Sequence, residues 1–420
     1  MRDFLPAEKR RREYSLGVIR RVFAAHGFDE IETPVMEDAA RLHAGLGGDN
    51  EKLAFGVLRR GLAPHDVAEI AASGDLGALT DLGLRYDLTV PLARFYATHR
   101  SELGAVFKAI QIAPVWRAER PQKGRYRQFM QCDIDIIGEA GMLAEVELIT
   151  ATAATLDALG LPGCTIRIND RRLLIGMLDL FGFPAAEHES VLITIDKLDK
   201  VGQDGVLAEL RDKGADAAAV DALRAFFHRQ VDSTPVPFGV AGIRSALPTG
   251  VDREVIAQVA EIGLAATTAA GSAGLVVFDP FLVRGMGYYT GTIFEIVHPS
   301  LGYSLGGGGR YDGMIGRFLG TEVPACGFSI GFERLVDLLG ETEDTRVDSV
   351  VLVHDRDLPA SRLLPLKTAL IRQGARVRLE PRSKNLKALL ERAAASGYQN
   401  FGLVTSATQT IADLELRALR

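Results

Sequence analysis

The fifteen residues from Val115 to Phe129 read Val-Trp-Arg-Ala-Glu-Arg-Pro-Gln-Lys-Gly-Arg-Tyr-Arg-Gln-Phe. Five of the first thirteen are basic, and Pro121 and Gly124 interrupt any regular element, so the stretch predicts a basic loop. Strand patterns lie on both sides of it, at 105–112 and 131–138. Because guanidinium groups form paired hydrogen bonds with phosphate oxygens, the loop suits a polyanionic ligand. The alternative is a solvated basic hairpin with no ligand.

The strand pattern that follows the loop, at 131–138, carries polar side chains on one face. It alternates polar and apolar residues, so Gln131, Asp133 and Asp135 share one side of the strand. Unpaired carboxylates on a buried strand cost free energy. A partner cation is therefore expected, either a structural one or the amino group of a ligand.

Two glycine-rich stretches follow later in the chain. Residues 279–291 combine Arg284 with the adjacent Tyr288 and Tyr289, and their glycines permit close backbone approach to a ligand. Residues 306–313 hold four glycines followed by Arg-Tyr-Asp-Gly. Neither stretch has the spacing of a dinucleotide fingerprint or of a P-loop. A tight hairpin and a bulged strand are the alternatives for the two stretches.

The segment Val323–Leu335 predicts a strand that enters a helix, with Arg334 in the first helical turn. From there the arginine could reach into a cleft above the sheet or lie on the surface. The chain has no HExxH or HxH, which argues against catalytic zinc. It also has no GxSxG and no cysteine with a nearby histidine, so the sequence shows no motif for a catalytic nucleophile.

At 420 residues the chain is too long for one compact core, and we expect two or three domains. Helical spacing of apolar residues predicts a first helix at 8–26. The stretch between 165 and 270 is rich in alanine, has several short helical patterns and contains none of the residues assigned to chemistry, which indicates an inserted domain. Strands alternating with helices after Glu341–Thr345 indicate a small α/β domain. The expected division is a catalytic domain in two parts, an insertion and a C-terminal domain, at 1–164, 165–270, 271–340 and 346–420.

Composition sets further bounds. The N-terminus lacks the apolar core of a signal peptide, and no run of eighteen apolar residues occurs, so no membrane association is expected. Three widely spaced cysteines do not form a disulfide framework and suit a reducing cytoplasm. The net charge of −6 means that any nucleic acid must bind through local basic patches.

Taken together and in order, these segments resemble histidyl-tRNA synthetases over nearly the whole chain. The Arg117–Phe129 loop resembles class II motif 2 in its histidyl form, and Val323–Leu335 resembles motif 3. The region Phe28–Met36 resembles motif 1, the dimer-forming element. The family's substrate-binding and histidine-specific motifs are matched by Arg85–Leu92, Arg284–Gly291 and Gly307–Gly313.

The resemblance implies an α+β fold, with the antiparallel class II sheet of six or seven strands flanked by helices. It also implies that the C-terminal domain is of the anticodon-binding kind. The residues it assigns to histidine are Asp87, Thr89, Gln131, Asp135, Tyr288, Tyr289 and Tyr311. Those it assigns to ATP are Arg117, Glu119, Arg125 and Arg334, and Arg284 joins Arg117 as a catalytic residue.

The implied reaction joins L-histidine to its cognate tRNA in two steps, through histidyl-adenylate made from ATP with Mg²⁺. The implied partners are that tRNA and a second copy of the chain in a homodimer. Two alternatives stay open, namely a non-catalytic regulatory subunit of ATP phosphoribosyltransferase and an enzyme that adenylates histidine without tRNA. The chain departs from the family pattern at Gly287, where the family often has Asp, and in its short ending at 405–420.

Overall fold

The computed structural model describes residues 1–46, 53–120, 124, 126–230, 238–271, 274–285, 287–339 and 348–419. Two compact units emerge, one made of Met1 and Val18–Leu338, the other of Arg2–Gly17 and Leu339–Arg420. Helix α1 (Pro6–Ala25) matches the helix expected at 8–26. The chain leaves it through Gly27, whose φ of 82° suits the left-handed turn after a helix.

An eight-stranded sheet forms the centre of the larger unit, in the order β1-β5-β6-β11-β10-β9-β7-β8. All neighbours are antiparallel except the edge pairs β1/β5 and β7/β8. The expected α+β class is confirmed, and the sheet has eight strands where six or seven were expected. In sheet order the strands are Asp29–Glu30, Phe107–Trp116, Gln128–Ile137, Ala325–Gly331, Gly306–Arg310, Thr292–Val297, Thr165–Asp170 and Val276–Phe278.

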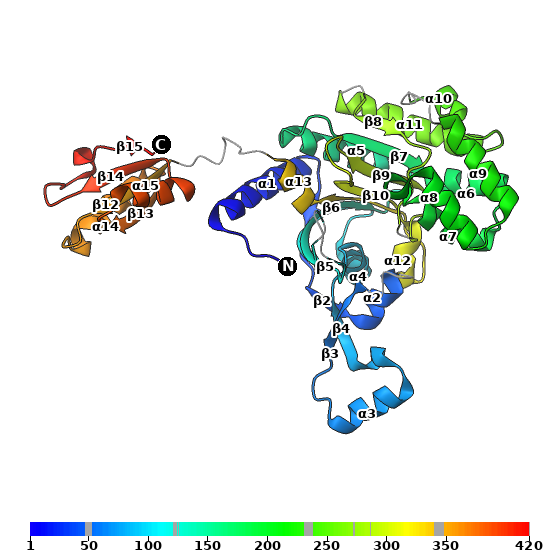
Figure 1. The fold of residues 1–420 in the computed structure, drawn as a ribbon, viewed down its shortest axis with the longest axis horizontal. Coiled ribbons are helices and arrows are strands. Elements are labelled where there is room, and N and C mark those ends of the chain that lie inside the picture. Colours follow the sequence, from blue (N-terminus) through cyan, green and yellow to red (C-terminus); the bar gives the residue numbers. More distant parts are fainter. Residues whose placement is uncertain are drawn as a thin grey trace. The chain divides into compact units, whose positions relative to one another are not determined.

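Helices α5 (Leu143–Ala158) and α11 (Arg253–Ala270) pack against each other and against strands of this sheet (Figure 1). The Asp252 side chain starts α11 by accepting from the Glu254 backbone N–H at 2.8 Å, a side-chain N-cap. In the core, the buried rings of Phe294 and Phe328 stack at 5.3 Å. Helices α4 (Thr89–His99), followed by η3 (Arg100–Glu102), and α12 (Asp312–Leu319) pack together.

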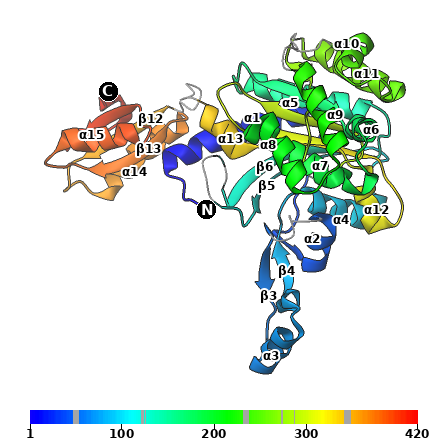
Figure 2. The ribbon, with the colours of Figure 1, turned by 45° about the vertical axis from the view of Figure 1, so that its right-hand side comes forward.

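A small three-stranded sheet, β2-β4-β3, extends from this unit as a projection with α3 near its tip (Figure 2). None of the ten residues of α3 is buried. The elements of this part are β2 (Met36–Asp38), α2 (Ala39–Leu46), β3 (Phe55–Leu58), α3 (Pro64–Ser73), η2 (Leu76–Leu79) and β4 (Thr80–Leu84).

The segment expected as an insertion at 165–270 is helical only from Arg171 onward. Its first six residues are β7, which lies in the main sheet between β9 and β8, so the sheet continues past the expected boundary. At the other end, α11 packs on α5 rather than standing apart. The intervening elements are α6 (Arg171–Phe181), η4 (Ala185–Glu187), α7 (His188–Ile195), α8 (Leu198–Asp212), α9 (Ala217–Gln230) and α10 (Val240–Ser245).

The C-terminal unit contains a second sheet, β13-β12-β14-β15, whose first three strands are parallel. One of its faces packs in a cluster with Leu363 and Leu366 of α14, the other with Leu389 and Ala393 of α15. Its elements are β12 (Ser349–His354), α14 (Ala360–Arg372), β13 (Arg376–Pro381), α15 (Leu386–Ala395), β14 (Asn400–Val404), η6 (Ile411–Asp413) and β15 (Arg417–Ala418). The expected linker at 341–345 lies outside the described residues.

Candidate active site

A single cavity in the larger unit brings together residues that lie far apart in the sequence. Its empty space is about 1060 Å³, including the part open to solvent. Eleven of the twelve residues assigned from the sequence line it: Asp87, Thr89, Arg117, Glu119, Gln131, Asp135, Arg284, Tyr288, Tyr289, Tyr311 and Arg334. The twelfth, Arg125, lies outside the described residues.

Three buried aspartates line one end of the cavity. Asp133 and Asp135 lie on β6, on the face that the alternating pattern predicts, and Asp87 precedes α4. Burial raises the pKa of all three carboxyls, and the nearby Asp135 raises the pKa of Asp133 further. The pKa of Asp135 rises to about 7.

Acceptor atoms at this end have no protein partner. Within the described part of the chain, Asp87 Oδ2, Gln131 Oε1 and Asp133 Oδ1 are buried without a hydrogen bond. The Gln131 amide instead donates to Ser329 Oγ at 2.9 Å, which fixes its carbonyl oxygen. Buried acceptors in a cavity of negative charge call for a ligand cation with several N–H donors.

Tyrosines stand beside the acidic end. The Tyr311 hydroxyl donates to Asp135 Oδ1 at 2.6 Å, and the ring of Tyr288 lies edge-on to that of Tyr311 at 6.2 Å. Burial raises the pKa of both phenols, so they remain protonated donors at neutral pH. Opposite them Gly327 allows Asp135 to approach β11, because a Cβ there would overlap the carboxylate.

Arg117 and Arg334 line the same cavity, and the charge of Arg117 counteracts the rise in the pKa of Asp87 and of Asp133. The guanidinium of Arg117 lies over the rings of Tyr86 and Phe129, 4.3 and 5.1 Å from their centroids, and its Nε donates to the Tyr86 carbonyl. Arg334 donates to the backbone carbonyls of Gly124 and Ser304, both at 2.7 Å. Stacking and backbone contacts hold these cations in place, so they are preorganised for an anionic ligand.

Arg284 is the third arginine that lines the cavity. Its Nη1 donates to Glu295 Oε1 at 2.7 Å. The Nε of Arg284 is buried and has no hydrogen bond among the described residues. A Cβ at Gly307 would stand 2.7 Å from its Cζ, so this glycine is what lets the guanidinium lie along β10.

The departure from the family pattern at Gly287 lies beside a carboxylate of α7. A Cβ at this position would stand 2.9 Å from Glu189 Oε1. This atom is the end of a side chain that is 50% exposed and paired with Arg171, so it can move aside. The space at 287 therefore does not by itself require a glycine.

Some cavity residues were not assigned from the sequence. Asp133 lay on the predicted strand face but received no role. Glu333 was missed because it precedes the motif 3 arginine at an ordinary helix start, yet its Oε2 accepts from the Met130 backbone N–H at 2.9 Å. Ser329 was missed because only the pairing of β11 with β6 brings it to Gln131.

Within the described part of the chain, no cluster of three or more His, Cys, Asp or Glu side chains is arranged to hold a metal ion. No described helix is both long and apolar enough to cross a membrane.

Known proteins resemble the chain along its length. Residues 1–335 match the family model of histidyl-tRNA synthetase. A histidine–tRNA ligase of Leifsonia xyli subsp. xyli is 62% identical over 420 residues, covering 100% of this chain and 97% of that protein. A probable histidine–tRNA ligase of Tropheryma whipplei is 43% identical over 417 residues, covering 96% of this chain and 93% of that one.

Solved structures agree. The histidyl-tRNA synthetase of Nostoc sp. PCC 7120 superposes with a TM-score of 0.78 at 25% identity, covering 100% of this chain and 93% of that one. An ATP phosphoribosyltransferase regulatory subunit/histidyl-tRNA synthetase from Bacillus halodurans shares the fold, with a TM-score of 0.75 at 19% identity over 97% of each chain. The fold is thus that of a class II aminoacyl-tRNA synthetase. The chain belongs to the histidyl-tRNA synthetase family, an enzyme family, as its motifs predicted.

Proposed function

We propose that the cavity activates L-histidine with ATP and that the protein then transfers the histidyl group to the 3′ end of its tRNA. The observation that carries this proposal is the set of three acceptors without a protein partner, on Asp87, Gln131 and Asp133, in a cavity that preorganised arginines also line. An α-ammonium supplies the three N–H donors that such acceptors need. A negatively charged triphosphate complements the arginines.

Histidine is the amino acid that fits the acidic end. Its ammonium would lie among Asp87, Thr89 and Gln131, with Asp133 as a further acceptor. Its imidazole would meet Asp135 and Tyr288, with Tyr289 and Tyr311 at the walls. A site that hydrogen-bonds a ring nitrogen rejects an analogue that lacks it, because its buried polar groups are then left unpaired.

The arginines would act on the phosphates. A carboxylate oxygen of histidine attacks the α-phosphorus, the bond to the bridging oxygen breaks, and pyrophosphate leaves. Arg117 and Arg284 would meet the negative charge that gathers on the α-phosphate, with Glu119 and Arg125 near ATP. Arg334 would lie at the adenine and γ-phosphate end. In the second step a hydroxyl of the terminal tRNA ribose attacks the histidyl carbonyl carbon, and AMP leaves. Catalysis is then positioning and electrostatics, with no covalent enzyme intermediate.

Mg²⁺ would enter with ATP. This ion keeps several waters and uses one or two carboxylates together with phosphate oxygens. The carboxylates of Glu119 and Glu333 both line the cavity, so the donor set fits a magnesium ion bound mainly by the nucleotide. When bound, the ion would neutralise part of the triphosphate charge.

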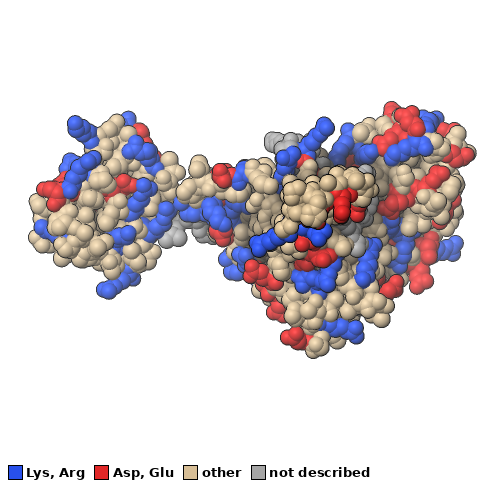
Figure 3. Space-filling model, turned by 90° about the horizontal axis from the view of Figure 1, so that it is seen from below, with Lys and Arg blue, Asp and Glu red and all other residues tan. Residues whose placement is uncertain are grey.

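We assign tRNA contact in part to the C-terminal unit. Between residues 348 and 419 there are eleven Lys and Arg against seven Asp and Glu, although the whole chain is acidic. Figure 3 shows many Lys and Arg side chains on the visible face of this unit. A local excess of positive charge suits a polyanion. The division into catalytic, inserted and anticodon-binding parts, the homodimer through motif 1 and the cytoplasmic location belong to the same proposal.

A charging assay with bulk tRNA and each of the twenty amino acids tests this function. We expect charging with histidine alone, dependent on ATP. Histidine binding without pyrophosphate exchange would favour the regulatory-subunit alternative. Pyrophosphate exchange without charging would favour an enzyme that adenylates histidine for another carrier.

A further inference from the structure

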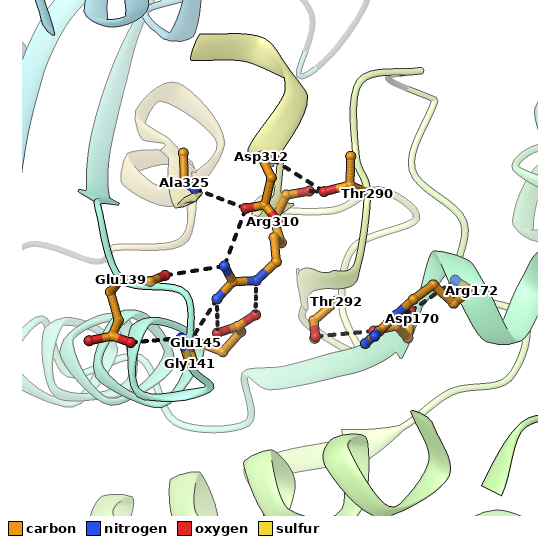
Figure 4. A network of polar contacts seen from close by, with 10 residues as sticks. All are labelled: Glu139, Gly141, Glu145, Asp170, Arg172, Thr290, Thr292, Arg310, Asp312 and Ala325. Carbon is orange, nitrogen blue, oxygen red and sulfur yellow. Dashed lines mark hydrogen bonds and ion pairs between the residues drawn. The ribbon is translucent and has the colours of Figure 1, made fainter. Parts of the chain in front are cut away.

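Each N–H group of the Arg310 guanidinium donates a hydrogen bond to another part of the protein. Its Nε and Nη2 donate to the two carboxylate oxygens of Glu145 on α5, both at 2.6 Å (Figure 4). Its remaining donors reach Gly141 O at 3.0 Å, and Glu139 O and Asp312 Oδ1, each at 3.2 Å. Five bonds satisfy the five N–H groups that arginine has, which the three donors of a lysine could not do.

The backbone around Arg310 is held from the other side as well. Asp312 Oδ1 accepts from the Ala325 N–H at 2.9 Å, and Thr290 N–H donates to the Arg310 carbonyl at 2.8 Å. The Tyr311 N–H donates to Ala325 O at 2.7 Å. Residues 310–312 are therefore fixed to α5, to β11 and to the turn before β9.

The same contacts join the two elements that carry Tyr311 and Asp135. Glu139 and Gly141 belong to the turn that directly follows β6, the strand of Asp135. Tyr311 sits between the two anchored residues and points its hydroxyl at Asp135. Arg310 thus ties the end of β6 to the end of β10, on the side away from the cavity.

We propose that the Arg310–Glu145 pair is a positioning device for histidine recognition, which sets the place of the Tyr311 hydroxyl against Asp135 and so the acceptor offered to the imidazole. This rests on the proposed function. Stability alone is a weak reason for the pair, because the cost of removing both charges from water offsets most of their attraction. Besides any stability, the five hydrogen bonds of Arg310 fix the geometry of the elements that they join.

The proposal has a pH signature. Tyr311 from the end of β10, Asp87 before α4, Asp133 on β6 and Cys326 on β11 all act on Asp135 or lie against it. Burial raises the pKa of Asp135 to about 7, and the Tyr311 hydrogen bond restrains that rise. If the hydroxyl loses its place, the pKa of Asp135 moves higher, and the ionised acceptor is present only at more alkaline pH.

The test measures pyrophosphate exchange by the full chain between pH 6 and 9. We expect Arg310→Lys to raise the KM for histidine by about tenfold, which corresponds to the loss of one good hydrogen bond to a charged group. The KM for ATP should rise by less than twofold. The midpoint of the histidine KM profile should move to higher pH. The imidazole of free histidine titrates in the same way whichever variant is assayed, so its contribution cancels when the pH midpoints of the variants are compared.

Arg172→Lys is the matched control. Arg172 lies near the Arg310–Glu145 pair, whose charges act on it, but the hydrogen bonds of its guanidinium go to buried Asp170, with Nη2 to Oδ2 at 2.8 Å (Figure 4). It therefore tests whether disturbing a neighbouring charged pair is enough to shift the midpoint. Its substitution should leave the pH midpoint for histidine unchanged. An equal shift in this control would mean that the midpoint reports general loosening, and would overturn the proposal.

A double-mutant cycle decides between positioning and general support. In the Tyr311→Phe background, Arg310→Lys should cause no further rise in histidine KM. Arg310 acts on histidine binding by positioning the Tyr311 hydroxyl, and this variant no longer has that hydroxyl. Additive effects would overturn the proposal. If Arg310→Lys does not fold, Glu145→Gln, which keeps the shape and removes the charge, takes its place in the cycle. A wild-type protein without histidine-dependent exchange would instead reject the proposed function.

Discussion

The guanidinium of Arg284 is held at one nitrogen by Glu295, with Nη1 2.7 Å from Oε1, while its buried Nε has no partner among the described residues. The pair fixes the cation without using all its donors. We expect Arg284→Ala to slow adenylate formation about 10²–10³-fold, as for other single electrostatic stabilisers, with a far smaller change in histidine affinity. Single-turnover kinetics measure this rate.

The alternative role for Arg284 is that of a brace for the segment at 279–291. Melting curves of the same variant separate the two roles. A protein that unfolds easily but reacts at near-normal speed at low temperature would make Arg284 a structural residue. Glu295→Gln should give a smaller loss of rate, since it leaves the cation present but less well oriented.

Asp135→Ala should weaken histidine binding much more than ATP binding. The carboxylate is the acceptor proposed for the imidazole, and a buried hydrogen bond to a charged group contributes about 1.5–3 kcal/mol. Calorimetric titration with each substrate measures the two affinities. Equal losses for both would remove Asp135 from the histidine subsite.

Asp133→Asn should stabilise the ligand-free protein, and more so as the pH rises. The pKa of Asp133 is raised well above its ordinary value by burial and by Asp135. A raised carboxyl pKa favours folding in the protonated form, so its stabilising effect is complete below about pH 4 and is lost as the pH rises through the folded pKa. The gain in melting temperature of the variant should therefore grow between pH 5 and 9. A gain independent of pH would contradict this reasoning.

Gly287→Asp should be tolerated by the fold, because the Glu189 side chain that it would meet is half exposed and can move aside. We expect only a small fall in melting temperature, from the closeness of two carboxylates, and recovery when Glu189→Ala is added. Glu189→Ala alone is the control for loss of the Arg171 ion pair. A large loss of stability that Glu189→Ala does not relieve would contradict this reasoning.

Removal of residues 346–420 should leave histidine-dependent pyrophosphate exchange largely intact and reduce tRNA charging sharply. Every assigned cavity residue precedes this segment. The melting curve of the shortened protein shows whether it has folded. A folded but exchange-deficient protein would contradict the proposed division of labour.

The sequence predicted those features of the cavity that depend on local periodicity. Alternation alone put Gln131, Asp133 and Asp135 on one face of β6, and the structure has them there. The edge strands β1 and β8 fall in stretches that predict strands, at 28–34 and from Gly274 onward, but two or three residues show too little periodicity to fix their bounds. The boundary at 165 missed β7 for a related reason, since a change in composition does not coincide with the edge of a sheet.

Long-range partners were beyond prediction. Arg310 was visible in its glycine-rich stretch, but Glu145 looks like any surface glutamate of an Ala/Leu/Glu-rich helix. The two are 165 residues apart, and only the folded sheet brings them together. Tyr311 and Asp135 meet across 176 residues for the same reason. The resemblance to a family supplied roles for single residues but not the contacts that hold them.

The three buried aspartates of the cavity link ligand binding to the stability of the fold. Burial raises the pKa of Asp87, Asp133 and Asp135, so the empty cavity disfavours their ionised forms. A ligand at 100 times its Kd adds about 2.7 kcal/mol to the stability of a protein that it binds only when folded. If histidine is that ligand, as proposed above, a shortage of histidine leaves more of the protein in its less stable, ligand-free form, which is easier to unfold and to degrade.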